Sequence, residues 1–461
     1  MTEIKDLIQP DRGQEATAIH LVTKSNFGDF SKPLSAGQRA SLAAQKFEGG
    51  AGAVGIIPDG DGFFVVGGVK NKDALSSYCL ASLASRLPEG TYRLVDAQPG
   101  AGVFGWMSAH YRFTRYKDDE KATGPRVLLT EQVGRLPGYI AEVEAELLVR
   151  DLVNTPAEDM GPAAIEAEFE TLAKANGAKL DVTKGDALEQ GYPMVHAVGR
   201  AAARHHAPRL LHLTWGKEDA PVLALVGKGV CFDSGGLDIK PASGMRLMKK
   251  DMGGAAHAIA LAGLVMEAGL NVRLHLLVPA VENAISGPAF RPGDVLASRK
   301  GLSVEIHNTD AEGRLILGDA LTRASEEGPD LIIDFATLTG AARIALGPDY
   351  AAMMARKDET AQSLIDAGKA NDDEPWRLPL PEAYREYLKS DIADMVNAQS
   401  NPYAGASVAG LFLDSFVSDG TDWVHFDTFA WRPFPKPGRS KGGTAYGLRA
   451  AWHMLKQRYS A

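Results

Sequence analysis

Two short segments of this chain place many ionisable side chains directly beside apolar runs. The first, residues 226–252, reads VGKGVCFDSGGLDIKPASGMRLMKKDM, and the second, residues 308–315, reads NTDAEGRL. Their candidate chemical groups are Lys228, Asp233, Asp238, Lys240, Asp251, Asp310, Glu312 and Arg314. Alone, each is more typical of a helix cap or a solvated charge. Together, carboxylates at the ends of buried strands repel one another unless cations hold them, and oxygen-rich sites suit Mn, Mg or Zn without Cys or His.

The elements that must position these groups alternate between strands and helices. Residues 222–226, 274–278 and 331–335 are near-continuous apolar runs, which are typical of parallel strands buried on both faces. Between them, residues 253–269 and 315–327 have helical periodicity. This alternation predicts an α/β catalytic domain with a mostly parallel central sheet flanked by helices. Ligand groups in such sheets gather beyond the carboxyl ends of the strands.

The N-terminal part predicts a second, smaller α/β domain. Residues 18–23 and 63–69 are apolar and β-branched enough for strands, and residues 38–47 have helical spacing. An amphipathic helix is expected at residues 136–153, where Asn-Thr-Pro at 154–156 stops it. We therefore expect an N-terminal domain over residues 1–135, a linking helix over 136–153 and a catalytic domain over 154–461.

Composition and motifs exclude several other classes of protein and of binding site. Residues 50–55 (GAGAVG) match GxGxxG, but they follow a helical segment and precede a strand, the reverse of a dinucleotide site. The chain has no HExxH, GxSxG or GxxxxGK[ST] motif, and His205-His206 is interpreted as a surface pair. A formal charge of -9 argues against nucleic acid as a partner. Two cysteines, a polar N-terminus and the lack of a long apolar stretch predict a cytoplasmic protein without a membrane span.

Three ordered segments carry a specific resemblance. NTDAEGRL at 308–315 resembles the signature octapeptide of the leucine aminopeptidase (cytosol aminopeptidase) family of dimetal peptidases. GKGVCFDSGGLDIKP from residue 227 and MKKDMGGAA from residue 248 resemble the other two metal-site segments of that family. The similarity covers about residues 136–449, including RDLVNTP, DFATLTGA and YLKSDIAD. The resemblance implies a leucyl aminopeptidase, a metallo-exopeptidase that cleaves peptide substrates.

The resemblance also implies a ligand set. Two divalent metal ions, Mn or Zn, would lie about 3–4 Å apart, the usual spacing of two-metal sites. Asp233 and Glu312 would bridge them, Asp310 would complete the more exchangeable site, and the tighter site would use Lys228 and Asp251. Because lysine binds a metal only after losing a proton, burial and the adjacent cations must depress its pKa from about 10.4.

Catalytic roles follow from the same resemblance. A metal-bridging hydroxide would attack the scissile carbonyl while Lys240 stabilises the oxyanion. Arg314 would hold a bicarbonate that moves the proton, since a guanidinium cannot act as the base. The substrate amine would bind a metal and Asp251. Pocket residues with an expected preference for leucine and other apolar side chains are Met248, Thr337 and Gly340. Relatives of this family form homohexamers, which sets the expected assembly.

Some positions depart from the family pattern, and alternatives stay open. HFDTFA at 425–430 places Phe429 near a glycine-like position, which puts the side-chain preference in doubt. His307 is interpreted as a half-buried structural histidine, and Cys231 as a small buried packing residue. The alternatives are a narrower dipeptidase or cysteinylglycine hydrolase on the same site, or an added DNA-binding or regulatory role.

Overall fold

The chain folds into two compact units. The computed structural model describes residues 4–95, 97–118 and 124–460. One unit comprises residues 1–147 and 434–441, and the other comprises 148–433 and 442–461. Helix α5 (Leu136–Asn154) covers the stretch expected as a linking helix and runs across the division between residues 147 and 148. The domain boundaries expected from the sequence stay a prediction.

The first unit is built on a six-stranded sheet in the order β1-β6-β5-β2-β4-β3. Its neighbours pair in parallel except β3 and β4, which are antiparallel. The strands are β1 (Ile8–Pro10), β2 (Thr17–Val22), β3 (Val54–Asp59), β4 (Gly62–Gly68), β5 (Gly90–Val95) and β6 (Arg126–Thr130). The helices are η1 (Ile4–Leu7), α1 (Phe27–Ser31), α2 (Ala36–Ala44), α3 (Ala81–Arg86), α4 (Gly102–Ser108) and η2 (Val133–Arg135). Strands β2 and β4 and helix α2 confirm the elements expected here, and residues 50–55 lie mostly in the α2–β3 connection, as interpreted.

The second unit contains a nine-stranded sheet in the order β16-β15-β18-β14-β9-β11-β8-β7, with β10 also paired to β11. Its centre, β18-β14-β9-β11, is parallel throughout, which confirms the mostly parallel catalytic sheet. The strands are β7 (Lys179–Lys184), β8 (Arg209–Trp215), β9 (Val222–Gly227), β10 (Gly229–Asp233), β11 (Arg273–Asn283), β14 (Leu331–Ala336), β15 (Ala352–Ala355), β16 (Trp376–Arg377) and β18 (Asp422–Asp427). Two small sheets contain β12 (Val295–Ala297), β13 (Ser303–Glu305), β17 (Met395–Val396), β19 (Trp431–Arg432) and β20 (Gly442–Gly443).

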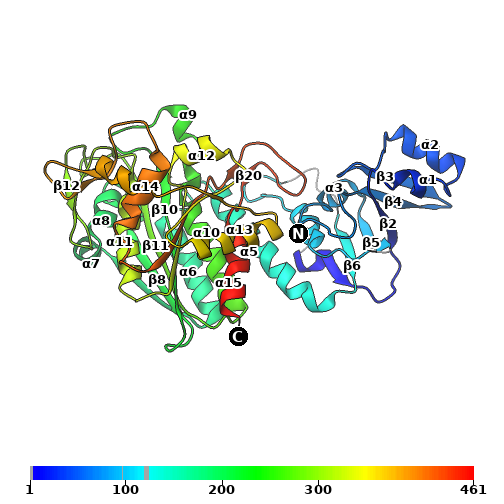
Figure 1. The fold of residues 1–461 in the computed structure, drawn as a ribbon, viewed down its shortest axis with the longest axis horizontal. Coiled ribbons are helices and arrows are strands. Elements are labelled where there is room, and N and C mark those ends of the chain that lie inside the picture. Colours follow the sequence, from blue (N-terminus) through cyan, green and yellow to red (C-terminus); the bar gives the residue numbers. More distant parts are fainter. Residues whose placement is uncertain (1–3, 96, 119–123, 461) are drawn as a thin grey trace. The chain divides into compact units, whose positions relative to one another are not determined.

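Helices cover both faces of this sheet (Figure 1). Helices α6, α10, α13 and α15 form one layer, and α8, α11 and α14 form the other, with α10 and α11 both packed on β9. The helices are α6 (Pro162–Asn176), α7 (Asp186–Gly191), α8 (Pro193–Gly199), η3 (Arg204–His206), α9 (Ala242–Met245), η4 (Met248–Met252), α10 (Gly253–Glu267), α11 (Glu312–Ser325), α12 (Gly340–Leu346), α13 (Asp358–Ala370), η5 (Glu382–Leu388), α14 (Gly405–Asp414) and α15 (Leu448–Tyr459). No helix in the described part of the chain is both long and apolar enough to cross a membrane.

The sheet interior explains why the apolar runs are so continuous. Leu223, Leu225 and Ile333 are all fully buried, because helices cover both faces of the strands to which they belong. One boundary expected from the sequence was wrong: α11 begins at Glu312, three residues before Leu315. An acidic residue is favourable in the first turn of a helix, where the backbone N–H groups concentrate positive charge. Helix α11 thus includes the end of the polar NTDAEG stretch, and the first turn of this helix carries Glu312 and Arg314.

Candidate metal centre

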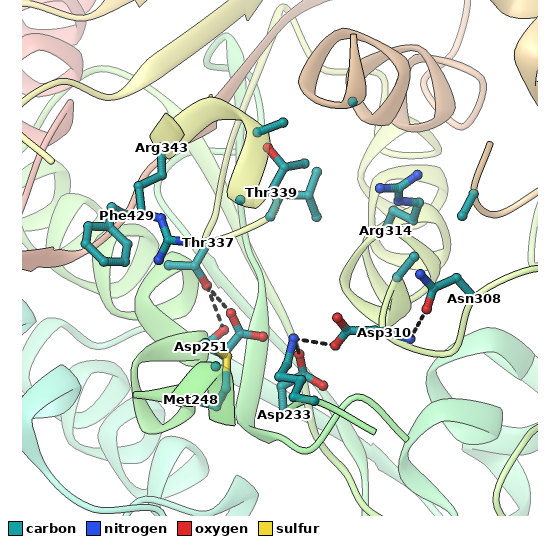
Figure 2. A pocket seen from close by; sticks show the side chains of 18 of the residues that line it. Asp233, Met248, Asp251, Asn308, Asp310, Arg314, Thr337, Thr339, Arg343 and Phe429 are labelled. Atoms are coloured by element: carbon teal, nitrogen blue, oxygen red, sulfur yellow. Dashed lines mark hydrogen bonds and ion pairs between the residues drawn. The ribbon is translucent and has the colours of Figure 1, made fainter. Parts of the chain in front are cut away.

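A cavity of about 730 Å³ lies at the carboxyl-end edge of the central sheet (Figure 2). Most of the site residues expected from the sequence line it: Lys228, Asp233, Lys240, Met248, Asp251, Asp310, Arg314, Thr337 and Gly340. Glu312 lies just behind this lining, with its Oε1 atom 2.9 Å from Lys228 Nζ. The structure therefore brings together residues that are up to 112 positions apart in the chain, from Lys228 to Gly340.

Three of the four acidic groups lie at or near the end of a regular element. Asp233 closes β10, Asp251 lies in η4 just before α10, and Glu312 opens α11. After Asp233 the chain must reverse sharply, and Gly235 and Gly236 adopt φ values of +86° and +64°. Side chains other than glycine rarely adopt this left-handed conformation. The GG pair thus allows the loop to turn back, with the Gly235 N–H donating to Asp233 Oδ1 at 2.9 Å.

Two lysines lie among the carboxylates. Lys228 Nζ is 2.7 Å from Asp251 Oδ2 and 2.9 Å from Glu312 Oε1. Lys240 Nζ is 2.9 Å from Asp233 Oδ2 and also contacts Asp310 Oδ1. Oxygen atoms of Asp233, Asp310 and Glu312 all lie within 4.8 Å of one another, close enough to bind common ions. The five side chains expected as ligands therefore converge on one centre.

Two carboxylates of this cluster, those of Glu312 and Asp310, have raised pKa values, as expected where acidic groups lie close together without enough positive charge. Burial, together with the negative charge of Asp233, raises the pKa of Glu312 to about 8. The same two causes raise the pKa of Asp310 to about 6. Glu312 Oε2 is buried and has no hydrogen-bond partner among the described residues. An orphaned carboxylate oxygen beside two other acidic side chains fits the oxygen-rich ligand set of a divalent cation.

Lys228 responds to the same charges in the opposite direction. Burial disfavours its charged form, but the carboxylates of Asp251 and Glu312 outweigh burial and raise the pKa of Lys228 above its ordinary value. Its ammonium group thus neutralises acids that divalent ions would also neutralise. Its side chain passes close to Gly313, because a Cβ atom there would lie 2.5 Å from Lys228 Cε. Any side chain at 313 would therefore force the end of Lys228 to shift.

Hydrogen bonds of polar side chains hold these loops in place, and one of the residues that make them, Asn283, was not expected from the sequence. Asn283 Nδ2 donates to Asp233 Oδ1 at 2.9 Å and to the Thr309 carbonyl at 3.1 Å. Asp238 accepts from the Thr309 N–H at 2.7 Å, so this acid joins the two signature loops. Thr337 Oγ1 donates to Asp251 Oδ1 at 2.7 Å, which orients that carboxylate. No sequence motif signals Asn283, because only the pairing of β10 with β11 brings it beside Asp233.

Arg314 is half-buried on α11 beside the acidic cluster and lines the cavity. Its Nη1 donates to the Asn397 carbonyl at 2.7 Å, whereas its Nε has no hydrogen-bond partner among the residues that the structure describes. Burial lowers the pKa of Arg314 to about 10, so the guanidinium is still charged at neutral pH. A half-buried guanidinium that faces a cavity with a free N–H group is suited to bind an anion.

The other side of the cavity carries the expected side-chain pocket. Figure 2 shows Met248, Asp251, Thr337, Arg343 and Phe429 grouped opposite Asp310 and Arg314. The Arg343 Cζ atom lies 4.9 Å from the centroid of the Phe429 ring, and Lys250 Nζ lies 5.6 Å from it. Phe429 thus lines the cavity, as the sequence interpretation suspected, and neither cation near it was foreseen.

The structure also shows how far one cysteine, His307 and the His205-His206 pair are buried. Cys231 is buried, as expected of a packing residue. His307 was expected to be half-buried but is exposed, and its Nε2 lies 3.2 Å from Glu305 Oε1. The surface interpretation of His205-His206 was wrong for His206, which is buried with its Nδ1 against Glu282. Pairing with this acid permits burial of a polar ring, which its sequence neighbourhood does not reveal.

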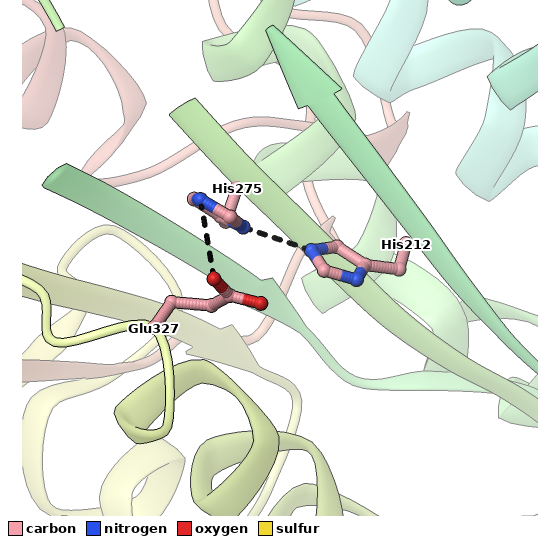
Figure 3. Close-up of side chains that lie close together, drawn as sticks. All are labelled: His212, His275 and Glu327. Atoms are coloured by element: carbon pink, nitrogen blue, oxygen red, sulfur yellow. Dashed lines mark hydrogen bonds and ion pairs between the residues drawn. The ribbon is translucent and has the colours of Figure 1, made fainter. Parts of the chain in front are cut away.

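A second group with metal-ligand chemistry lies away from this cavity (Figure 3): His212 on β8, His275 on β11 and Glu327 after α11. His212 Nε2 and His275 Nδ1 are 3.0 Å apart, and His275 Nε2 is 3.8 Å from Glu327 Oε2. Burial lowers the pKa of His212 to about 4, so the ring is neutral at pH 7. The guanidinium of Arg323 already neutralises Glu327. The hydrogen bond between the two histidines and the ion pair of Glu327 with Arg323 therefore account for this group.

Comparisons with known proteins agree with this geometry. The cytosol aminopeptidase family, catalytic domain, matches residues 147–451, and the M17 aminopeptidase N-terminal domain matches residues 17–129. A probable cytosol aminopeptidase of Leifsonia xyli subsp. xyli is 40% identical over 441 residues, covering 90% of this chain and 88% of the relative. Peptidase B of Pectobacterium carotovorum subsp. carotovorum is 43% identical over 318 residues, covering 67% and 72%.

Solved structures extend the likeness to the whole fold. The crystal structure of cytosol aminopeptidase from Coxiella burnetii has a TM-score of 0.92 and 44% identity, and the match covers 98% of this chain and 100% of that one. The bottromycin maturation enzyme BotP in complex with Mn has a TM-score of 0.85 and 31% identity, with coverage of 96% and 99%. By both domains and by overall fold, this chain belongs to the cytosol aminopeptidase family and is a metal-dependent aminopeptidase.

Proposed function

We propose that this aminopeptidase uses two divalent ions, Mn or Zn, to release N-terminal amino acids from peptides. The convergence of carboxylate oxygens from Asp233, Asp310 and Glu312 within 4.8 Å of one another is the observation that carries this proposal. Asp233 and Glu312, together with Asp310, would hold the ions through their carboxylate oxygens. A bound Mn in BotP, a structural relative, supports Mn as one of the candidates.

The remaining ligands would divide between the two ions. Lys228 and Asp251, in contact with each other, would complete one site, and Asp310 would complete the other. Lys228 must release a proton to bind, and divalent ions that neutralise Asp251 and Glu312 would remove the charges that now hold that proton. When bound, the pair of ions supplies Lewis acidity that activates water and polarises the scissile carbonyl.

The protein groups supply position and charge. Lys240, at the edge of the cluster, would stabilise the negative charge that develops on the carbonyl oxygen. Arg314 would hold a bicarbonate through its free Nε–H, and this anion could accept a proton where the guanidinium cannot. Thr337 fixes Asp251, which would receive the substrate's α-amine. A requirement for a free amine at this carboxylate would restrict cleavage to the first peptide bond.

The side chain of the first residue would occupy the part of the cavity near Met248, Thr337 and Gly340. An apolar methionine and the absence of a side chain at 340 suit leucine and similar residues. The narrower dipeptidase and DNA-binding alternatives are not favoured, and the charge of -9 opposes the latter. A cytoplasmic homohexamer is proposed from the family likeness alone, and sedimentation velocity of the purified chain would show whether six copies associate.

Removal of divalent ions tests the proposal directly. We expect the purified chain to hydrolyse a leucyl amide, to lose activity on dialysis against a chelator and to regain it with Mn or Zn. An N-acetylated leucyl amide is the matched control substrate, since it lacks the free amine and should not be cleaved. Hydrolysis that persists after metal analysis shows complete removal of divalent ions would contradict the proposal.

A further inference from the structure

Two cations in the cavity have no part in the proposed chemistry. Lys250 and Arg343 both line the cavity, and both lie near the face of Phe429, at 5.6 and 4.9 Å from its centroid. Lys250 is buried and its Nζ is 3.4 Å from Asp251 Oδ1. The side-chain end of the cavity therefore differs from a simple apolar pocket, because fixed positive charge borders it.

Arg343 is the freer of the two cations. The structure shows no ion pair for it with any described acidic residue, and it is exposed to solvent on the cavity side of α12. Gly340 lies three residues earlier on this helix, so the two positions share a helix face. Figure 2 shows the Arg343 side chain pointing toward Phe429 and Thr337. The side chain of a peptide's first residue that extends past Gly340 would therefore approach the guanidinium of Arg343.

The ring of Phe429 gives this cation a defined place. A guanidinium over an aromatic face is attracted to the ring, which limits the positions the arginine samples. Arginine also stays protonated at every pH at which a protein is folded. The charge at this wall is therefore permanent, unlike that of a lysine.

We propose that Arg343, held over Phe429, makes this pocket favour anionic over cationic N-terminal residues. The inference rests on the proposed function, because it requires the first residue of the peptide to enter near Gly340. An N-terminal glutamate would place its carboxylate near the guanidinium. An N-terminal lysine would meet like charge from Arg343, which selects against it. Glutamine, equal in length to glutamate but neutral, would rank between them.

The test compares kcat/KM for p-nitroanilides of glutamate, glutamine, lysine and leucine. For the wild-type chain we expect a glutamate-to-lysine ratio of about 10, since one exposed charge pair is worth up to about fivefold in each direction and the two effects multiply to at most about 25-fold. Arg343→Glu should lower this ratio by at least about 20-fold, and the ratio of Arg343→Met should lie between those of the wild type and Arg343→Glu. Arg291→Glu is the matched control, since Arg291 is an exposed arginine outside the cavity and should leave the ratio unchanged.

A second measurement needs no variant. Raising the salt concentration to about 1 M shortens the screening length to roughly 3 Å, so the wild-type ratio should move toward 1. Ratios within twofold of wild type in Arg343→Glu, or a wild-type ratio that ignores salt, would overturn the inference. Leucine hydrolysis separates the two proposals. If it is metal-dependent, only the selectivity is in question, and if it is not, the proposed function and this inference fail together.

Discussion

A Lys228→Arg variant is expected to retain at most one divalent ion per chain and to lose roughly a thousandfold in kcat, since a catalytic ion supplies several kcal/mol of transition-state stabilisation. Lys228 Nζ lies 2.7 Å from Asp251 Oδ2 and 2.9 Å from Glu312 Oε1, two of the carboxylates proposed to hold the ions. A guanidinium cannot lose its proton there, so it cannot donate a lone pair to a metal. It is also longer, and close packing of Gly313 against the lysine stem leaves it little room.

Metal analysis after gel filtration in the presence of Mn provides the measurement. Lys300→Arg is the matched control, because the Lys300 Nζ donates to the Ser415 carbonyl at 2.6 Å outside the cavity. Both variants keep the formal charge of the chain, so a change in long-range electrostatics cannot account for a difference. Two ions per chain in a folded Lys228→Arg protein would show that Lys228 is not a ligand.

The strands that position this residue could be predicted because their environment is simple. Residues of β9, β11 and β14 are buried on both faces, so hydrophobicity alone determines their sequence pattern. The start of α11 could not be read the same way. Its first turn carries Glu312 and Arg314, which serve the cavity rather than the core, and a polar stretch of this kind resembles a loop in sequence. The polar residues that the cavity requires thus hid the helical pattern at the start of α11.

The site could be predicted only where its residues lie in segments that resemble those of the family. Residues outside them are brought in by contacts between distant parts of the chain. Asn397, for example, accepts a hydrogen bond at its carbonyl from Arg314, which is 83 positions away. Likewise, Arg343 and Phe429 meet because β14 and β18 are neighbours in the sheet, so the segments that follow them lie close together. One sequence without an alignment contains no record of such pairings.

Lys240 tests whether the cavity separates metal binding from charge stabilisation. A Lys240→Met variant should bind two divalent ions and lose about 10²–10³ in kcat, the usual cost of removing one oxyanion-stabilising donor. The lysine lies at the edge of the cluster, where its Nζ is 2.9 Å from Asp233 Oδ2. Burial opposes its charge, but Asp233 outweighs burial and raises the pKa of Lys240 above its ordinary value. It is therefore a cation throughout the pH range of the assay.

The two readouts distinguish a catalytic from a structural lysine. If Lys240 acts on the transition state, kcat falls with the metal content unchanged, and Lys240→Arg restores part of the rate because it restores the charge. If Lys240 only holds Asp233 and Asp310 in place, the metal content falls together with kcat, and methionine and arginine variants are equally impaired. Lys228 and Lys240 are thus expected to differ, although both now pair with acids of one cluster: the first must lose its proton to function, and the second must keep it.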